Sequence, residues 1–197
     1  DTRPWAENSS TIMRKNQPII GANDGASGVA VILELAKIMK KNPPPIGVSL
    51  VLFDAEDYGT SADPWSYAKG SQFFAQNIPI NYPMYAINLD MIADREPEFY
   101  IERYSYQQNP TLVLELWELA ESLNLDTFKK QAKYTIFDDH VPLYQMAGIP
   151  AIDIIDFDFP NEKTNYHHTH QDIVQNCSPK GLGEVGTLML NHIYNIK

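Results

Sequence analysis

Three carboxylates stand within four residues where an apolar run ends. The run from Val48 to Phe53 is followed directly by Asp54, Glu56 and Asp57. Like charges gathered at the end of a buried strand repel one another in a medium of low dielectric constant. A bound cation removes that cost, so the cluster indicates a metal site at the carboxyl end of a strand. A charged turn between a strand and a loop is the alternative that this segment alone leaves open.

Two further acids occupy positions of the same kind. Asp90 ends a second apolar run, and Asp24 lies in a glycine-rich turn before a helix. Ligands bind beyond the carboxyl ends of the strands in open α/β sheets, so we expect Glu56, Asp57 and Asp90 to share one edge. Taken alone, Asp24 is more readily explained as the cap of the helix that follows it.

Three histidines, His167, His168 and His170, fall within four loop positions before the last helix. They are candidate metal ligands, and a solvated histidine-rich loop is the competing interpretation. The segment Asp138–His140 precedes a short helical stretch and on its own reads as a helix N-cap. Each of these segments is weak by itself, and their joint order carries more weight.

Strands and helices are expected to alternate along the chain. Apolar runs predict strands over residues 46–53, 85–92, 98–102 and 149–155, and helical spacing predicts helices over 29–41, 67–76, 111–123 and 179–194. This alternation indicates a three-layer α/β fold with a mostly parallel central sheet flanked by helices. The sequence shows no internal repeat, linker or low-complexity segment, so residues 1–197 are expected to form one catalytic domain.

Composition limits the class of partner. The net charge of −10, from 15 basic and 25 acidic residues, argues against nucleic acid or an anionic membrane surface. The single Cys177 excludes an internal disulfide, and no apolar run approaches a membrane span, so no membrane insertion is expected. The chain starts at Asp1 without an initiator methionine, and we expect a processed or truncated product whose start does not report on export.

The order of the candidate segments resembles peptidase family M28, the zinc aminopeptidases, and its relatives, the animal-type glutaminyl cyclases. The resemblance covers essentially the whole chain and implies the fold of the zinc exopeptidases. It is carried by Gly21-Ala22-Asn23-Asp24 with Gly28, by Glu56-Asp57, by Asn88-Leu89-Asp90-Met91-Ile92, by Asp138-Asp139-His140, by Gly148-Ile149-Pro150-Ala151 and by His168-Thr169 with Asp172.

The resemblance implies that Asp24, Asp57 and His168 bind zinc. It assigns Glu56 as the general acid and base, and Asp90 as a group that binds the substrate amine or a second metal. Two oxygens and one nitrogen leave one zinc position open, which is the pattern of a catalytic site. The family usually has glutamate at the position of Asp57, and the shorter aspartate must bring the backbone closer to the metal.

Two activities fit this resemblance, and both act on a free peptide N-terminus. A glutaminyl-peptide cyclotransferase converts N-terminal glutamine to pyroglutamate, releases ammonia and needs one zinc. An M28 aminopeptidase hydrolyses the N-terminal peptide bond and generally holds two metals. A histidine of the second site would lie two residues before Asp1, so we expect one zinc per chain and a chain that lacks the N-terminal segment of the family.

The cyclase is favoured by several segments, among them Asp158-Phe159-Pro160 before the His168 loop. Trp65 lies in a long loop after the acidic pair and resembles the tryptophan loop that lines the cyclase pocket as a substrate contact. The segment Asp138–Pro142 is closer to the cyclase version than to the aminopeptidase version. There the resemblance implies that Asp138 joins Glu56 and Asp90 in a catalytic acid network.

Two observations point the other way. The run Gly25–Gly28 reads like the aminopeptidases, and His167 stands where cyclases commonly have tryptophan. A third reading is a truncated, inactive member of the family, which need not bind zinc. We expect the cyclase, with zinc as cofactor and peptide or protein N-termini as substrates. The resemblance also implies an extracytoplasmic location, in the periplasm or outside the cell.

Overall fold

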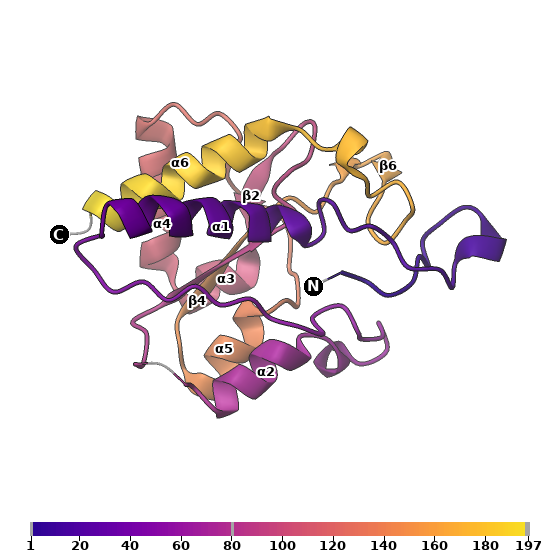
Figure 1. The fold of residues 1–197 in the computed structure, drawn as a ribbon, viewed down its shortest axis with the longest axis horizontal. Coiled ribbons are helices and arrows are strands. Elements are labelled where there is room, and N and C mark those ends of the chain that lie inside the picture. Colours follow the sequence, from indigo (N-terminus) through magenta and orange to yellow (C-terminus); the bar gives the residue numbers. More distant parts are fainter. Residues whose placement is uncertain (1, 80, 196–197) are drawn as a thin grey trace.

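The computed structural model describes residues 2–79 and 81–195 (Figure 1). Its α-helices are α1 (Ala26–Lys41), α2 (Lys69–Gln76), α3 (Arg103–Gln108), α4 (Pro110–Ser122), α5 (His140–Ala147) and α6 (Pro179–Asn195). Its strands are β1 (Ala86–Asp90), β2 (Phe99–Ile101), β3 (Phe128–Ala132), β4 (Ala151–Ile155), β5 (Pro160–Asn161) and β6 (Thr164–Asn165). The predicted helices over 29–41, 67–76, 111–123 and 179–194 are confirmed, with small shifts at their ends.

Parallel strands lie between two layers of helices. Strand β1 pairs with β4 in parallel, from Ala86 opposite Ala151 to Asp90 opposite Ile155, and β2 pairs with β3 in parallel. Figure 1 shows α1 and α6 on one side of these strands, and α2 and α5 on the other. The predicted three-layer α/β arrangement with parallel strands flanked by helices is therefore confirmed.

The main core fills the space between the strands and the helices α1, α4 and α6. Every residue of β4 is buried, as expected for a strand covered on both faces. The helices contribute one apolar face each, and burial of each large side chain stabilises the fold by about 1.5–3 kcal/mol. The buried members from these helices include Val31, Leu35, Leu112, Val113, Leu116, Trp117, Val185, Leu188 and Met189.

The strand predicted over residues 46–53 is wrong. No described strand includes these residues, and Leu50 and Leu52 are 40% and 56% exposed. Exposed and half-buried side chains largely alternate along the segment, and Phe53 packs edge-to-face on Phe74. An apolar run predicts extended backbone, but a strand also needs a second backbone at hydrogen-bonding distance, which is a property of the tertiary structure.

Helix α3 and strand β3 were not predicted because neither has an apolar pattern. In α3 the buried residue is Ser105, and the helix starts where Glu102 accepts hydrogen bonds from the backbone N–H groups of Tyr104 and Ser105. Strand β3 reads Phe-Lys-Lys-Gln-Ala and is half-buried to exposed. Both elements are specified by what they contact rather than by hydrophobic periodicity.

Two glycines let helices approach the backbone around the end of β1. A Cβ atom on Gly28 of α1 would lie 2.0 Å from the carbonyl oxygen of Leu89. A Cβ atom on Gly181 of α6 would lie 2.2 Å from the carbonyl oxygen of Ile92. Only glycine permits these approaches. The two helices therefore pack closely on the backbone before and after Asp90, at Leu89 and at Ile92.

Candidate functional site

The predicted site residues come from separate segments of the chain. Asp24 precedes α1, Glu56 and Asp57 follow residues 46–53, Asp90 ends β1, Asp138 precedes α5, and His168 lies in the loop after β6. The structure brings these segments together beyond the carboxyl ends of β1 and β4, which run in parallel. This is the edge at which open α/β folds bind their ligands.

The helix-cap interpretation does not hold for Asp24, whereas the segment Asp138–His140 does supply the N-cap of the helix that follows it. The N-cap of α1 is Gly25 rather than Asp24, and the N-cap of α5 is Asp139. Neither cap residue makes a side-chain cap hydrogen bond. The carboxylate of Asp24 lies near the His168 imidazole, and that of Asp138 accepts a hydrogen bond from the Asn88 amide.

Asp24, Asp57 and His168 form one compact group. The His168 Nε2 atom lies 3.0 Å from Asp57 Oδ1 and 3.5 Å from Asp24 Oδ2. Asp24, Asp57 and His168 are only 2%, 5% and 4% exposed, in that order. Burial, followed by the charge of Asp57, raises the pKa of Asp24 well above its usual value. A divalent cation fits this donor set, because its charge would cancel the repulsion between two buried carboxylates.

Further hydrogen bonds hold the group in place. Glu7 Oε1 lies 3.1 Å from His168 Nδ1. A carboxylate at this position favours the hydrogen on Nδ1 and leaves the lone pair of Nε2 for a metal. Asp172 accepts hydrogen bonds from the backbone N–H groups of Asn23, at 2.8 Å, and of Asp24, at 3.2 Å. These contacts fix both the imidazole and the turn that carries Asp24.

Glu56, Asp90 and Asp138 form an adjoining acid cluster. Burial, followed by the charges of Asp138 and then Asp57, raises the pKa of Glu56 well above its usual value. Burial and the same two charges raise the pKa of Asp90. Repulsion between these carboxyl groups therefore favours the retention of protons within the cluster. A positioned carboxyl group that gains and loses a proton can act as an acid and a base.

Left-handed backbone occurs at one candidate residue, His168, and directly beside two others, Glu56 and Asp90. The φ angles are 51° at Ala55, 48° at Met91 and 55° at His168. This conformation is costly for a residue with a side chain and is retained where the surrounding structure imposes it. The first two residues adjoin Glu56 and Asp90, so the chain turns sharply at the points where it presents these groups.

His167, one of the three histidines that the sequence offered as candidate metal ligands, contacts the metal-type group. Its ring stacks on that of His168, with centroids 3.6 Å apart and planes at 28°. Its Nε2 atom lies 3.8 Å from Asp24 Oδ2. Burial, and then the charge of His168, lowers the pKa of His167 to about 4, so the ring is neutral at neutral pH. The signal in the sequence that could have identified this contact was the pair of adjacent histidines, His167 and His168.

Trp65, the predicted substrate contact, packs against Phe137, the residue before Asp138. It belongs to the 3-10 helix Pro64–Ser66, where Asp63 Oδ1 accepts a hydrogen bond of 3.0 Å from the Trp65 N–H group. The side chain is 37% exposed and meets Phe137 edge-to-face, with centroids 5.0 Å apart. Phe137 directly precedes Asp138 in the chain, so this aromatic pair lies near the backbone that carries one of the carboxyl groups.

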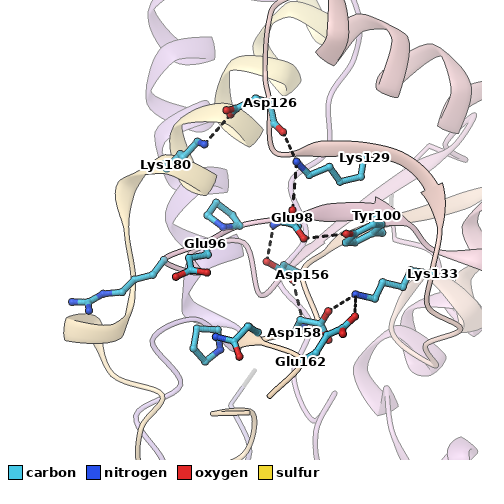
Figure 2. Close-up of a pocket in the computed structure, with 14 residues that line it drawn as sticks. Glu96, Glu98, Tyr100, Asp126, Lys129, Lys133, Asp156, Asp158, Glu162 and Lys180 are labelled. Carbon is cyan, nitrogen blue, oxygen red and sulfur yellow. Dashed lines mark hydrogen bonds and ion pairs between the residues drawn. The ribbon is translucent and has the colours of Figure 1, made fainter. Parts of the chain in front are cut away.

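A separate hollow of about 500 Å³ is lined by none of the predicted site residues (Figure 2). Its walls carry opposite charges that pair with one another. Lys133 lies 2.6 Å from Asp158 and 2.7 Å from Glu162, and Lys180 lies 2.8 Å from Asp126. Its lysines are paired with carboxylates, and we assign this hollow no catalytic role.

Comparison with known proteins points to the same family as the residues. The sequence profile of Peptidase family M28 matches residues 1–193. Among curated proteins, aminopeptidase YwaD of Bacillus subtilis is 27% identical over 182 residues. These residues are 88% of this chain, and the chain spans 37% of the length of that relative.

Similar solved structures include two kinds of enzyme. Tannerella forsythia glutaminyl cyclase is 36% identical with a TM-score of 0.94, over 100% of this chain and 71% of that one. Bacteroides thetaiotaomicron glutaminyl cyclase bound to N-acetylhistamine is 34% identical, with a TM-score of 0.94. A leucine aminopeptidase precursor from the same organism is 34% identical, with a TM-score of 0.93. The comparisons with the two Bacteroides thetaiotaomicron structures each cover 100% of this chain and 70% of the chain of the solved structure. Since the family profile matches almost every residue, this chain belongs to peptidase family M28.

Proposed function

We propose that this chain is a zinc-dependent glutaminyl-peptide cyclotransferase. It would cyclise the N-terminal glutamine of peptides to pyroglutamate and release ammonia. The observation that carries the proposal is the cluster of Glu56, Asp90 and Asp138, whose charges act on one another and on the metal-type residue Asp57. The glutaminyl cyclases among the similar structures support it.

Asp24, Asp57 and His168 are the residues that would hold zinc. One oxygen of each carboxylate lies within 3.5 Å of the His168 Nε2 atom, and Glu7 orients the imidazole. Zinc bound there would polarise the side-chain amide of the substrate glutamine. We expect one zinc per chain, measured by elemental analysis of the pure protein.

Glu56 is the proposed proton carrier. An α-amino group has a pKa near 8, so part of the substrate amine is already neutral at pH 7. Glu56 accepts the proton that the amine loses as its nitrogen attacks the side-chain amide carbon. A new C–N bond forms, the bond from that carbon to the amide nitrogen breaks, and Glu56 returns the proton to the departing ammonia. Asp90 and Asp138 hold the amine in place, and orientation within one residue supplies much of the rate.

An M28 aminopeptidase is the second candidate. Glu56 would then take a proton from an attacking water and pass it to the amine of the leaving peptide. His167 is the observation that favours this activity, because it offers a further nitrogen donor 3.8 Å from Asp24 Oδ2. The aminopeptidases named above support it as well. Two tightly bound metal ions per chain would favour the aminopeptidase.

The two activities differ in their products, and mass spectrometry separates them. Zinc-loaded protein is incubated with one peptide that starts with glutamine and a matched peptide that starts with leucine. A cyclase lowers the mass of the first by about 17 Da, the mass of ammonia expelled by the amine, and leaves the second unchanged. Release of free leucine without cyclisation would overturn the proposal. No reaction with either peptide at full zinc occupancy would favour an inactive member of the family.

The proposed partners follow from the substrate. Peptide or protein N-termini bind at the acid cluster, and we propose no nucleic-acid partner. Within residues 2–79 and 81–195, no helix has the length and apolarity needed to cross a membrane. An extracytoplasmic location, periplasmic or secreted, remains part of the proposal.

A further inference from the structure

Residues 2–9 contact every segment that carries a candidate zinc ligand. The Thr2 hydroxyl donates a hydrogen bond of 3.4 Å to the backbone carbonyl oxygen of Asp24. The backbone N–H group of Asn8 donates at 3.3 Å to the carbonyl oxygen of His168. Arg3, which lies between these two residues in the sequence, contacts the segment of Asp57. One short stretch of chain therefore joins three segments that are far apart in the sequence.

Arg3 is a buried cation. Its side chain is only 5% exposed, and the guanidinium carbon lies 4.5 Å from the ring centroid of Trp5 and 5.6 Å from that of Tyr67. The faces of aromatic rings attract a cation but do not replace its hydrogen bonds. A charge removed from water is tolerated only with close polar partners, so the hydrogen bonds of Arg3 indicate what this residue does.

One nitrogen of the guanidinium holds the backbone that carries Asp57. The Arg3 Nη1 atom donates to the carbonyl oxygen of Asp57 and, at 2.8 Å, to that of Gly59. These two oxygens belong to the turn from which the Asp57 side chain extends. Aspartate has one methylene group fewer than glutamate, so any displacement of this backbone is passed directly to the carboxylate. Arg3 therefore acts on Asp57 through the main chain.

A second nitrogen of the guanidinium reaches His168 through Glu7. The Arg3 Nη2 atom lies 2.7 Å from Glu7 Oε1, and the same oxygen lies 3.1 Å from His168 Nδ1. An ionised carboxylate only accepts hydrogen bonds, so the hydrogen between Glu7 and His168 belongs to Nδ1. The Nε2 atom is left facing Asp57 Oδ1 at 3.0 Å and Asp24 Oδ2 at 3.5 Å. Arg3 thus fixes the oxygen atom that orients the imidazole.

We propose that Arg3 is a positioning residue that places two of the three zinc ligands at once. Its Nη1 atom fixes the backbone of Asp57, and its Nη2 atom fixes Glu7, which orients His168. Lysine could not replace it fully, because an ammonium group lacks the planar fork that serves both partners. The inference rests on the proposed function, since it concerns the residues that would hold zinc.

The zinc affinity of the folded protein is the first test. Zinc is titrated into metal-free protein in competition with a chromophoric chelator, well below the thermal midpoint of the metal-free form. Arg3→Met removes the guanidinium and should raise the Kd for zinc by about 10–100-fold. Arg3→Lys keeps the charge without the fork, and its Kd should lie between those of wild type and Arg3→Met.

Arg14→Met is the matched control. Arg14 is exposed, and its Nε atom donates to Gln17 at 3.2 Å. The same substitution at this surface position should leave the Kd for zinc within about twofold of wild type.

Glu7→Gln tests the route from Arg3 to His168. Glutamine keeps the shape of Glu7 but not the charge that pairs with Arg3, so the Kd for zinc should rise by about tenfold. Because Arg3 acts on His168 through Glu7, the double variant Arg3→Met/Glu7→Gln should raise the Kd by less than the product of the two single effects. If Arg3→Met does not fold, Arg3→Lys and Glu7→Gln carry the test.

A spectroscopic readout separates positioning from a loss of stability. Co²⁺ bound in place of zinc has visible absorption bands that depend on the geometry of its ligands. At saturating Co²⁺ these bands should change in Arg3→Met and remain as in wild type in Arg14→Met. Wild-type protein that binds zinc but transforms neither peptide would contradict the proposed activity, while the zinc affinities and the Co²⁺ spectra would still decide the role of Arg3.

Three results would overturn the inference. One is a Kd for zinc in Arg3→Met, or in both Arg3→Lys and Glu7→Gln, that stays within about twofold of wild type, as at an unrelated surface position. Another is a Co²⁺ spectrum that Arg3→Met leaves unchanged. The third is a double variant whose Kd rises by the full product of the single effects, because Arg3 and Glu7 would then act independently.

Discussion

Glu56 and Asp57 are adjacent in the chain but have different partners. Asp57 lies 3.0 Å from the His168 imidazole, whereas Glu56 faces the charges of Asp138 and Asp90. Both residues follow the left-handed Ala55. In the proposed mechanism, Asp57 binds the metal and Glu56 moves a proton.

The first prediction concerns this division of roles. Glu56→Gln should lower turnover by about 10²-fold or more while zinc stays bound, because the amide has nearly the same shape but cannot accept the proton. Turnover and zinc content are measured on the same preparation. Asp57→Ala and His168→Ala are the matched controls, and both should lose the metal. Turnover near the wild-type rate in Glu56→Gln would show that another group is the base.

A second residue-scale prediction lies in the hollow of Figure 2. Asp156 is buried there and accepts hydrogen bonds from the backbone N–H groups of Glu98, at 2.9 Å, and Asp158, at 3.2 Å. Burial raises the pKa of Asp156 to about 7 from an ordinary value of 3.8. The folded protein thus keeps a proton that the unfolded chain releases. The stability that this proton contributes is complete below the unfolded pKa and is lost as the pH rises toward 7.

Asp156→Asn removes this titration. Between about pH 5 and pH 7, the free energy of unfolding of the variant should improve relative to wild type, by up to about 1.4 kcal/mol per pH unit. Denaturant unfolding at several pH values measures the difference. A constant difference across this range would show that Asp156 is ionised in the folded protein.

At the scale of elements, helix α6 contains a matched pair of glycines. An added Cβ on Gly181 would meet the carbonyl oxygen of Ile92 at 2.2 Å, whereas an added Cβ on Gly183 has nothing within 4 Å. Gly181→Ala should destabilise the protein by about 1–3 kcal/mol, because backbone must move. Gly183→Ala should stabilise it by about 0.5–1 kcal/mol, because alanine is the better helix former. Chemical denaturation measures both, and equal effects would contradict this packing of α6 on the chain after β1.

Elements with a clear apolar pattern were predictable, and those defined by contacts were not. The apolar runs that became β1 and β4, and the amphipathic spacing of α4, reflect burial on known faces. Helix α3 is polar and begins at the capping carboxylate of Glu102. The same carboxylate binds His140 from α5, so α3 matters to the site through a contact that no local pattern records.

At the scale of the whole molecule, metal binding should contribute to stability. Asp24 and Asp57 are buried together, and a cation that binds only the folded state cancels their repulsion. A ligand present at 1,000 times its Kd stabilises the folded state by about 4 kcal/mol. Dialysis against a chelator should therefore lower the thermal midpoint, and added zinc should restore it. The control His168→Ala should have the same midpoint with and without chelator. An unchanged midpoint in wild type would contradict a metal at this group.

The sequence by itself determined the family, the α/β class with parallel strands, and the set of candidate site residues. Ligand chemistry is a property of residue type, and strand ends can be located from where apolar runs stop. Residue type and order along the chain were therefore enough to select Asp24, Glu56, Asp57, Asp90, Asp138 and His168 as candidates.

Only the tertiary structure decided which groups support these residues. Glu7 contacts His168 across 161 positions of sequence, and Glu102 contacts His140 across 38. The same holds for residues 46–53, whose apolarity predicts a strand but which belong to no described strand. A sequence pattern records which face of an element is apolar, whereas hydrogen bonds between distant segments depend on the three-dimensional path of the chain. Pairing partners and the location of buried protons follow from that path.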